Sequence, residues 1–176
     1  MKKRITVFGS AFPKDGETEY AAAYKIGCLL AQRGFDINTG GYMGIMEAVS
    51  KGVKENDGKV TGVTLNYVKS KPNIYLDEII SCDTLFERIT KLIELGDAYI
   101  VLPGGTGTLL ELAVVWEYLN KNLMGTKPVA CLSIMWKEIG GIINRQLKAE
   151  GRDLNRISFF DNIEELVEFV AINLQG

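Results

Sequence analysis

Short runs rich in β-branched and aromatic residues alternate with longer segments of helical periodicity along the whole chain. This alternation is typical of a mostly parallel sheet with helices on both faces, and no linker or repeat interrupts it. We therefore expect a three-layer α/β fold in one domain, residues 1–176. The pattern predicts strands at 5–9, 35–39, 59–65, 78–82, 98–103, 128–134 and 157–160, and helices at 17–33, 44–55, 84–95, 108–122, 137–149 and 161–174.

In an open parallel sheet, ligands bind outside the carboxyl ends of the strands. The loops that follow the strands are therefore the places to look for function. Three of these loops are rich in small residues, and two of them carry clusters of glycine. They are Gly9–Ala11, Thr39–Gly41 and Pro103–Thr108.

Composition excludes several classes of protein. The 176 residues include 20 Lys and Arg against 22 Asp and Glu, so the net charge is −2. This balance argues against a nucleic-acid-binding surface or a polybasic membrane patch. No apolar run reaches about 18 residues, so we expect no membrane span. The N-terminal apolar run is too short for a signal peptide, and it is better interpreted as the first strand.

The chain has no histidine, which excludes Ser-His-Asp triads, Cys-His pairs and HExxH zinc sites. Its three cysteines, Cys28, Cys82 and Cys131, lie far apart and form no CxxC pair. They are typical of reduced thiols in a cytoplasmic protein, and they indicate neither a disulfide framework nor a metal site. Any chemistry must therefore depend on carboxylates, Arg, Lys, hydroxyls and backbone amides.

The Pro103–Thr108 loop joins a buried strand to an apolar helix. Glycines at a helix start let backbone N–H groups approach an anion, and the helix dipole favours negative charge there. Thr106 and Thr108 can add hydroxyl donors. The alternative is a tight turn in which glycine serves only a positive φ. The loop is neither a Walker A motif nor a GxGxxG fingerprint, and we predict a phosphate or carboxylate site.

The second glycine cluster, Gly40, Gly41 and Gly44, also lies where a strand meets a helix. By itself it is adequately explained as a turn. Two such loops at strand carboxyl ends support each other, because one phosphorylated ligand could contact both.

Arg88 interrupts the apolar side of the helix predicted at 84–95, which begins with a Thr84–Glu87 capping box. A guanidinium directed toward a core or cleft needs an anionic partner, because an unpaired buried charge is costly. A structural ion pair, or an arginine extending to water at the edge of the arc, is the alternative. The apolar arc comprises Phe86, Ile93, Ile89, Leu85, Leu92 and Leu95.

Glu111 lies in a helix that is apolar on nearly every side, 108–122. Apolar surroundings raise a carboxyl pKa and suit acid/base or cation-stabilising work. Arg88 is its natural partner, because both project from helices that flank strand 98–103. The alternative is that Thr108 and Glu111 form a capping box. The excess apolar surface of this helix, which includes Trp116 and Tyr118, predicts a homodimer.

The motifs resemble the Lonely Guy family, cytokinin riboside 5′-monophosphate phosphoribohydrolases often labelled lysine decarboxylases. PGGTGTLLE at 103–111 matches the family signature PGGxGTxxE, and TGGYMGIMEAVSKG resembles its second glycine motif. Phe8-Gly9-Ser10 is similar to its first loop, and Glu87-Arg88 to the segment that carries its catalytic arginine. The resemblance covers roughly residues 4–133.

The resemblance implies a Rossmann-like homodimer that cleaves the N-glycosidic bond of a nucleoside 5′-monophosphate. We expect no cofactor and no metal. Ile89 stands where plant-type members have a lysine, and Leu110 stands where many members have a second glutamate, so the resemblance does not define the base. A non-catalytic nucleotide or pterin carrier, related to molybdenum cofactor carriers that share TGGY-type loops, is the alternative. The implied catalytic residues are Arg88 and Glu111, and the implied substrate-binding residues are Gly9, Ser10, Gly40, Gly41, Gly44, Gly104, Gly105, Gly107 and Thr108.

Overall fold

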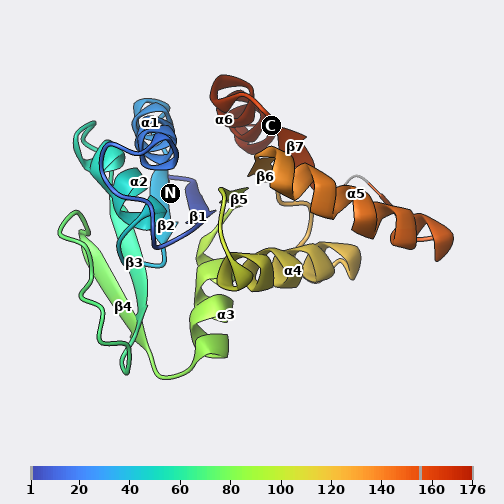
Figure 1. Ribbon diagram of the computed structural model, residues 1–176, viewed down its shortest axis with the longest axis horizontal. Coiled ribbons are helices and arrows are strands. Elements are labelled where there is room, and N and C mark those ends of the chain that lie inside the picture. The colour runs from blue at the N-terminus through green and yellow to red at the C-terminus, as the bar shows by residue number, and fades with distance from the viewer. Residues whose placement is uncertain (1, 155, 176) are drawn as a thin grey trace.

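The computed structural model describes residues 2–154 and 156–175, in which a seven-stranded sheet is covered by helices on both faces (Figure 1). Every strand pairing is parallel, so the predicted α/β three-layer architecture is confirmed. The strands are β1 (Arg4–Phe8), β2 (Asp36–Thr39), β3 (Val60–Leu65), β4 (Glu78–Cys82), β5 (Ala98–Val101), β6 (Val129–Leu132) and β7 (Ser158–Phe160). The helices are α1 (Thr18–Gln32), α2 (Ile45–Lys54), α3 (Leu85–Leu95), α4 (Thr106–Asn120), α5 (Ile134–Ala149) and α6 (Ile163–Gln175).

The order of the strands places a topological switch point at the centre of the sheet. The order is β4-β3-β2-β1-β5-β6-β7, so the chain builds outward from β1 in one direction and from β5 in the other. In sheets of this kind, the loops after the two central strands diverge and leave a crevice at the carboxyl edge. The loops after β1 and β5 are the ones that begin at Gly9 and Pro103.

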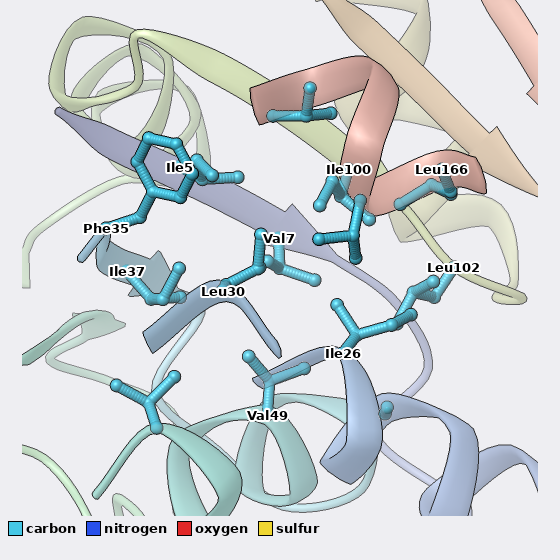
Figure 2. Packing of buried hydrophobic residues seen from close by; sticks show 14 of the residues in the cluster. Ile5, Val7, Ile26, Leu30, Phe35, Ile37, Val49, Ile100, Leu102 and Leu166 are labelled. Carbon is cyan, nitrogen blue, oxygen red and sulfur yellow. The ribbon is translucent and has the colours of Figure 1, made fainter. Parts of the chain in front are cut away.

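Side chains alternate between the two faces of the sheet, as the period of a β-strand requires. Ile5 and Val7 of β1 pack with α1, α2 and α6, whereas Phe8 packs with residues of α3, α4 and α5. Figure 2 shows the first of these clusters, in which Ile26 and Leu30 of α1 meet the strand residues. Two apolar layers therefore hold the central strands in place beneath the crevice.

Two predicted boundaries are wrong at the start of a helix. Helix α4 begins at Thr106, two residues before the predicted 108, and α5 begins at Ile134 where the sequence predicted strand. Ser133 has a φ of 128° and turns the chain directly from β6 into α5. Trp136 is then fixed by a hydrogen bond from its indole Nε1 to the carbonyl of Leu102, at 3.0 Å. The apolar run 128–134, predicted as one strand, therefore ends in the first turn of α5. Trp136 in this turn is held against the end of β5.

None of the helices within 2–154 and 156–175 combines the length and the hydropathy needed to cross a membrane.

Candidate functional site

A cavity of about 310 Å³ opens at the switch point, between the loops after β1, β2 and β5. This volume lies at the lower end of the range for small-molecule sites, and the position is the one that parallel α/β sheets use for ligands. The walls combine backbone of the glycine loops, an ion pair and several apolar side chains. The lining residues are Val7, Phe8, Gly9, Ser10, Ala11, Phe12, Gly40, Met46, Arg88, Gly105, Thr106, Gly107, Thr108 and Glu111.

Ser10 connects all three loops. Its backbone N–H donates to the carbonyl of Pro103 at 3.0 Å, and its own carbonyl accepts from the N–H of Ile45 at 2.8 Å. Its hydroxyl Oγ accepts from the N–H of Phe12 at 3.2 Å. The first loop is therefore held against the other two, and the floor of the cavity is fixed by backbone contacts.

The Pro103 loop forms the exposed N-terminus of α4. Gly105 is the N-cap, and no side chain caps the helix there, so its first N–H groups have no intrahelical partner. A Cβ at Gly105 or Gly107 would meet no atom within 4 Å, so open space adjoins both residues. Neither residue is among the glycines with positive φ, which excludes the interpretation that they serve only a turn. Their place at the cavity edge suits approach by an anion.

Gly104 has a different role in the same loop. A Cβ there would lie 2.1 Å from the Thr108 hydroxyl, so glycine makes room for that side chain. Gly104 does not line the cavity, whereas Thr108 does.

The second glycine loop serves mainly the geometry of the turn. Gly41 and Gly44 have φ values of 78° and 70°, which L side chains rarely adopt. A Cβ at Gly44 would also lie 2.4 Å from the carbonyl carbon of Ala11, so this glycine lets the first and second loops touch. Neither Gly41 nor Gly44 lines the cavity, contrary to the expectation from the sequence.

Gly40, in contrast, gives space to Arg88. A Cβ at Gly40 would lie 2.0 Å from the guanidinium Nη2 of Arg88. The guanidinium Nε donates to the carbonyl of Val63 at 2.8 Å, and its carbon Cζ lies 5.9 Å from the centre of the Tyr42 ring. Arg88 is therefore held by β3 on one side and by the second loop on the other.

Arg88 and Glu111 form a buried ion pair in the cavity wall, as the sequence predicted. The guanidinium Nη1 lies 3.3 Å from Glu111 Oε1, and the two residues are only 9% and 8% exposed. The position of Arg88 within the apolar side of α3 has thus brought it to its partner. The apolar side of α3 is not buried along its whole length. Leu85 and Phe86, on the first turn of the helix, are 41% and 72% exposed.

Burial raises the pKa of Glu111 to about 7, although the charge of Arg88 and the hydrogen bond from it act in the opposite direction. The carboxyl group can therefore exchange a proton near neutral pH. The alternative capping role is wrong, because α4 begins at Thr106 and Thr108 is inside the helix. The capping box at Thr84 is confirmed in part. The Thr84 side chain accepts from the N–H of Glu87, while the Glu87 carboxylate accepts from the N–H of Asp83.

A residue far from the glycine motifs holds the second loop. The N–H of Asn73 donates to the carbonyl of Gly41, and its side-chain amide donates to the carbonyl of Tyr42, both at 2.9 Å. Tyr42 is fixed in turn by the N–H of Leu65, which donates to its hydroxyl at 2.8 Å. Tyr42, whose ring faces Arg88, is therefore held by hydrogen bonds at both its backbone carbonyl and its hydroxyl.

The structure brings eight of the eleven sequence-predicted site residues to one cavity, whereas Gly41, Gly44 and Gly104 do not line it. Sequence reasoning missed Phe12, Met46 and Asn73. A phenylalanine in a loop between a predicted strand and a predicted helix was a usable signal for Phe12, whereas no local pattern marks Asn73. The eight are Gly9, Ser10, Gly40, Arg88, Gly105, Gly107, Thr108 and Glu111.

Within residues 2–154 and 156–175, no three Cys, Asp or Glu side chains converge on a point where a metal ion could be held. Cys28, Cys82 and Cys131 are free thiols.

Fold and cavity together define a parallel α/β protein of Rossmann-like topology, with its site at the switch point. The model of the SLOG cluster4 family matches residues 2–166. A cytokinin riboside 5′-monophosphate phosphoribohydrolase of Mycobacterium marinum is 33% identical over 181 aligned positions, which cover 95% of this chain and 92% of the relative. The chain therefore belongs to the Lonely Guy family, within this SLOG group.

A further relative and two solved structures extend the comparison. A probable enzyme of the same name from Oryza sativa subsp. japonica is 34% identical over 75% of this chain, which spans only 54% of that relative. The molybdenum cofactor binding protein of Rippkaea orientalis has a TM-score of 0.79 at 23% identity, covering 99% of this chain and 98% of that one. The molybdenum cofactor carrier protein of Chlamydomonas reinhardtii has a TM-score of 0.75 at 19% identity over 100% of both chains. At these identities the two structures show a shared fold alone.

Proposed function

We propose that this protein hydrolyses the N-glycosidic bond of a nucleoside 5′-monophosphate, which gives a free base and ribose 5-phosphate. The observation that carries the proposal is the Arg88–Glu111 pair, buried in the same cavity as the open N-terminus of α4. Relatives that are phosphoribohydrolases by name support the same reaction.

The N-terminus of α4 is the proposed phosphate site. Backbone N–H groups at Gly105 and Gly107 and the hydroxyl of Thr108 would donate to the 5′-phosphate. This anchor lies away from the bond that breaks, so its binding energy can hold the sugar in the geometry that the reaction requires.

Glu111 would act on the sugar. Cleavage of the glycosidic bond develops positive charge on the ribose, and a carboxylate close to C1′ stabilises that charge or orients the attacking water. Arg88 is a donor without a removable proton, so it cannot be the base; it holds the carboxylate and favours its ionised form. We therefore expect kcat/KM to rise with pH until Glu111 is ionised, near its pKa of about 7.

A nucleotide or pterin carrier is the second candidate, and its support is the fold shared with two molybdenum cofactor proteins. A carrier needs the anion site but no carboxylate whose pKa lies near neutrality. The buried Arg88–Glu111 pair favours the enzyme, because an unused ion pair in a cavity wall costs desolvation without benefit to binding.

The two candidates are separated by incubating the wild-type protein with a panel of purine and pyrimidine nucleoside monophosphates, including N6-prenylated AMP. Free base and ribose 5-phosphate are quantified by chromatography, and binding is measured in parallel by calorimetry. Release of base from at least one nucleotide is expected. Tight binding with no base released from any of them would support the carrier.

We also propose that two copies of the chain associate through α4 and α5. An apolar groove of about 340 Å³ runs between these helices, and Leu109 and Ile143 at its edge are 41% and 42% exposed. Trp116 contributes less than the sequence suggested, because at 7% exposure its own chain already covers it. A second copy is the commonest cover for such a face.

A further inference from the structure

Phe12 is exposed at the mouth of the cavity although it is one of the most apolar residues of the chain. It is 88% exposed, whereas Phe8, four residues earlier, is 2% exposed and packs from β1 against residues of α3, α4 and α5. Burial of a phenylalanine side chain stabilises a protein substantially, and the fold does not use Phe12 in this way. Phe12 nevertheless lines the cavity beside Ser10 and Ala11.

The backbone before Phe12 is the most firmly held part of the first loop. Ser10 is bonded to Pro103 and to Ile45, and its hydroxyl accepts from the N–H of Phe12. These contacts set where the Phe12 ring can lie relative to the second and third loops. An exposed ring on a fixed backbone position can meet a ligand without the cost of ordering a free loop.

The cavity has walls of two kinds. Arg88, Glu111, Thr108 and the N-terminus of α4 supply charge and hydrogen-bond donors, whereas Val7, Phe8, Ala11, Phe12 and Met46 supply apolar surface. Of the two phenylalanines in this lining, Phe8 is buried and Phe12 is exposed. A nucleotide has the same division, since its phosphate is charged and its base has two flat π faces. In the proposed binding mode, the phosphate lies at the N-terminus of α4 and the sugar lies at Glu111. The base would then contact the apolar part of the cavity wall.

We propose that the ring of Phe12 stacks on the base of the bound nucleotide. This inference rests on the proposed function, because it takes the cavity to be a nucleotide site. Stacking uses the flat face of the base and not its edge, so it should strengthen the binding of a nucleotide relative to ribose 5-phosphate, which has no base.

The test compares two ligands on matched variants. Affinities for AMP and for ribose 5-phosphate are measured by calorimetry for Phe12→Ala, Phe12→Trp and Phe86→Ala, all with Glu111→Gln so that AMP is not consumed. Phe86 is the control, because it is a 72% exposed phenylalanine on α3 that does not line the cavity. Since Phe12 is itself 88% exposed, replacing it removes little packing.

Phe12→Ala should weaken the binding of AMP by about 5- to 150-fold, the range typical for loss of one base–aromatic stack. The affinity for ribose 5-phosphate should not change. Phe12→Trp should retain AMP binding, and Phe86→Ala should change neither ligand. An equal loss of affinity for both ligands would overturn the inference, because Phe12 would then only maintain the conformation of the first loop. Unchanged affinities for both ligands would also overturn it, and a lower molecular mass of Phe12→Ala in light scattering would then show that a second copy of the chain covers Phe12. Base release by the wild type is measured separately, so a chain that binds AMP through Phe12 without hydrolysing it contradicts the proposed function alone.

Discussion

Glu111 should make the protein less stable as pH rises toward neutrality, and Glu111→Gln should remove this loss. Glutamine keeps the volume of the side chain, and its carbonyl oxygen can still accept from Arg88 Nη1, now 3.3 Å from Glu111 Oε1. The substitution therefore removes one titrating group and little packing. It isolates the energetic cost of holding an ionised carboxylate at this site.

The size of the effect follows from the pKa of Glu111, which burial raises from 4.5 to about 7. A raised carboxyl pKa means that the folded state binds the proton more tightly than the unfolded state. The stability that this contributes is fully present below about pH 4.5 and is lost as pH rises to about 7. Each pKa unit corresponds to about 1.4 kcal/mol, so the wild type should lose roughly 3 kcal/mol relative to Glu111→Gln over this window.

The assay is urea unfolding of both proteins at half-unit intervals from about pH 4.5 to pH 8.5, with the free energies subtracted at each pH. Glu164→Gln on α6 is the control. Glu164 is exposed, and the hydrogen bond from Lys25 lowers the pKa of its carboxyl, so this substitution should leave the curve flat between pH 5 and pH 8. A flat curve for Glu111→Gln as well, or one that rises with pH, would refute the argument that the cavity raises the pKa of this carboxyl.

Three other predictions test separate parts of the site. The protein should have the mass of a homodimer in light scattering at micromolar concentration, through the apolar face of α4 and α5; a monomeric mass would contradict this. AMP should bind at least about tenfold more tightly than adenosine in calorimetry, because each charge-assisted hydrogen bond to the phosphate contributes roughly 1.5–3 kcal/mol. Equal affinities would exclude a phosphate site at α4. Gly107→Ala should leave the free energy of unfolding unchanged or raise it by up to about 1 kcal/mol, since alanine is the better helix former and its Cβ meets no atom within 4 Å. The same substitution should weaken the binding of AMP by about tenfold or more, because the phosphate is expected to approach the backbone of Gly107. Undiminished AMP binding would place the phosphate elsewhere.

Local chemistry explains why much of the site was predictable from the sequence. Arg88 stood out because a charge on an apolar helix face needs a partner, and the structure places Glu111 there. The glycine loops stood out because small residues cluster after strands, and the topology brings the loops after β1 and β5 to one crevice. Periodicity was sufficient for every helix and strand in the described residues, apart from boundaries such as those of α4 and α5.

What the sequence could not show depends on contacts between distant residues. The individual roles of the glycines follow from φ and from neighbours, so Gly40 and Gly41 look alike in sequence although one makes room for Arg88 and the other forms a turn. Asn73 holds a loop 31 residues away, and nothing near it in the sequence indicates this contact. The start of α4 at Thr106, which leaves Gly105 as an open N-cap, could likewise be seen only in the structure.

The central claim is that Glu111 acts on the ribose of a bound nucleotide, and free-base release by wild type and Glu111→Gln tests it most directly. Both proteins are saturated with the best nucleotide of the panel at pH 8, where a carboxyl group with a pKa of about 7 is ionised, and binding is confirmed for each. We predict that release falls by roughly 100-fold or more in Glu111→Gln while the nucleotide still binds, as is typical when charge stabilisation of a transition state is lost. Equal rates of base release by the two proteins would remove Glu111 from the mechanism and contradict the account.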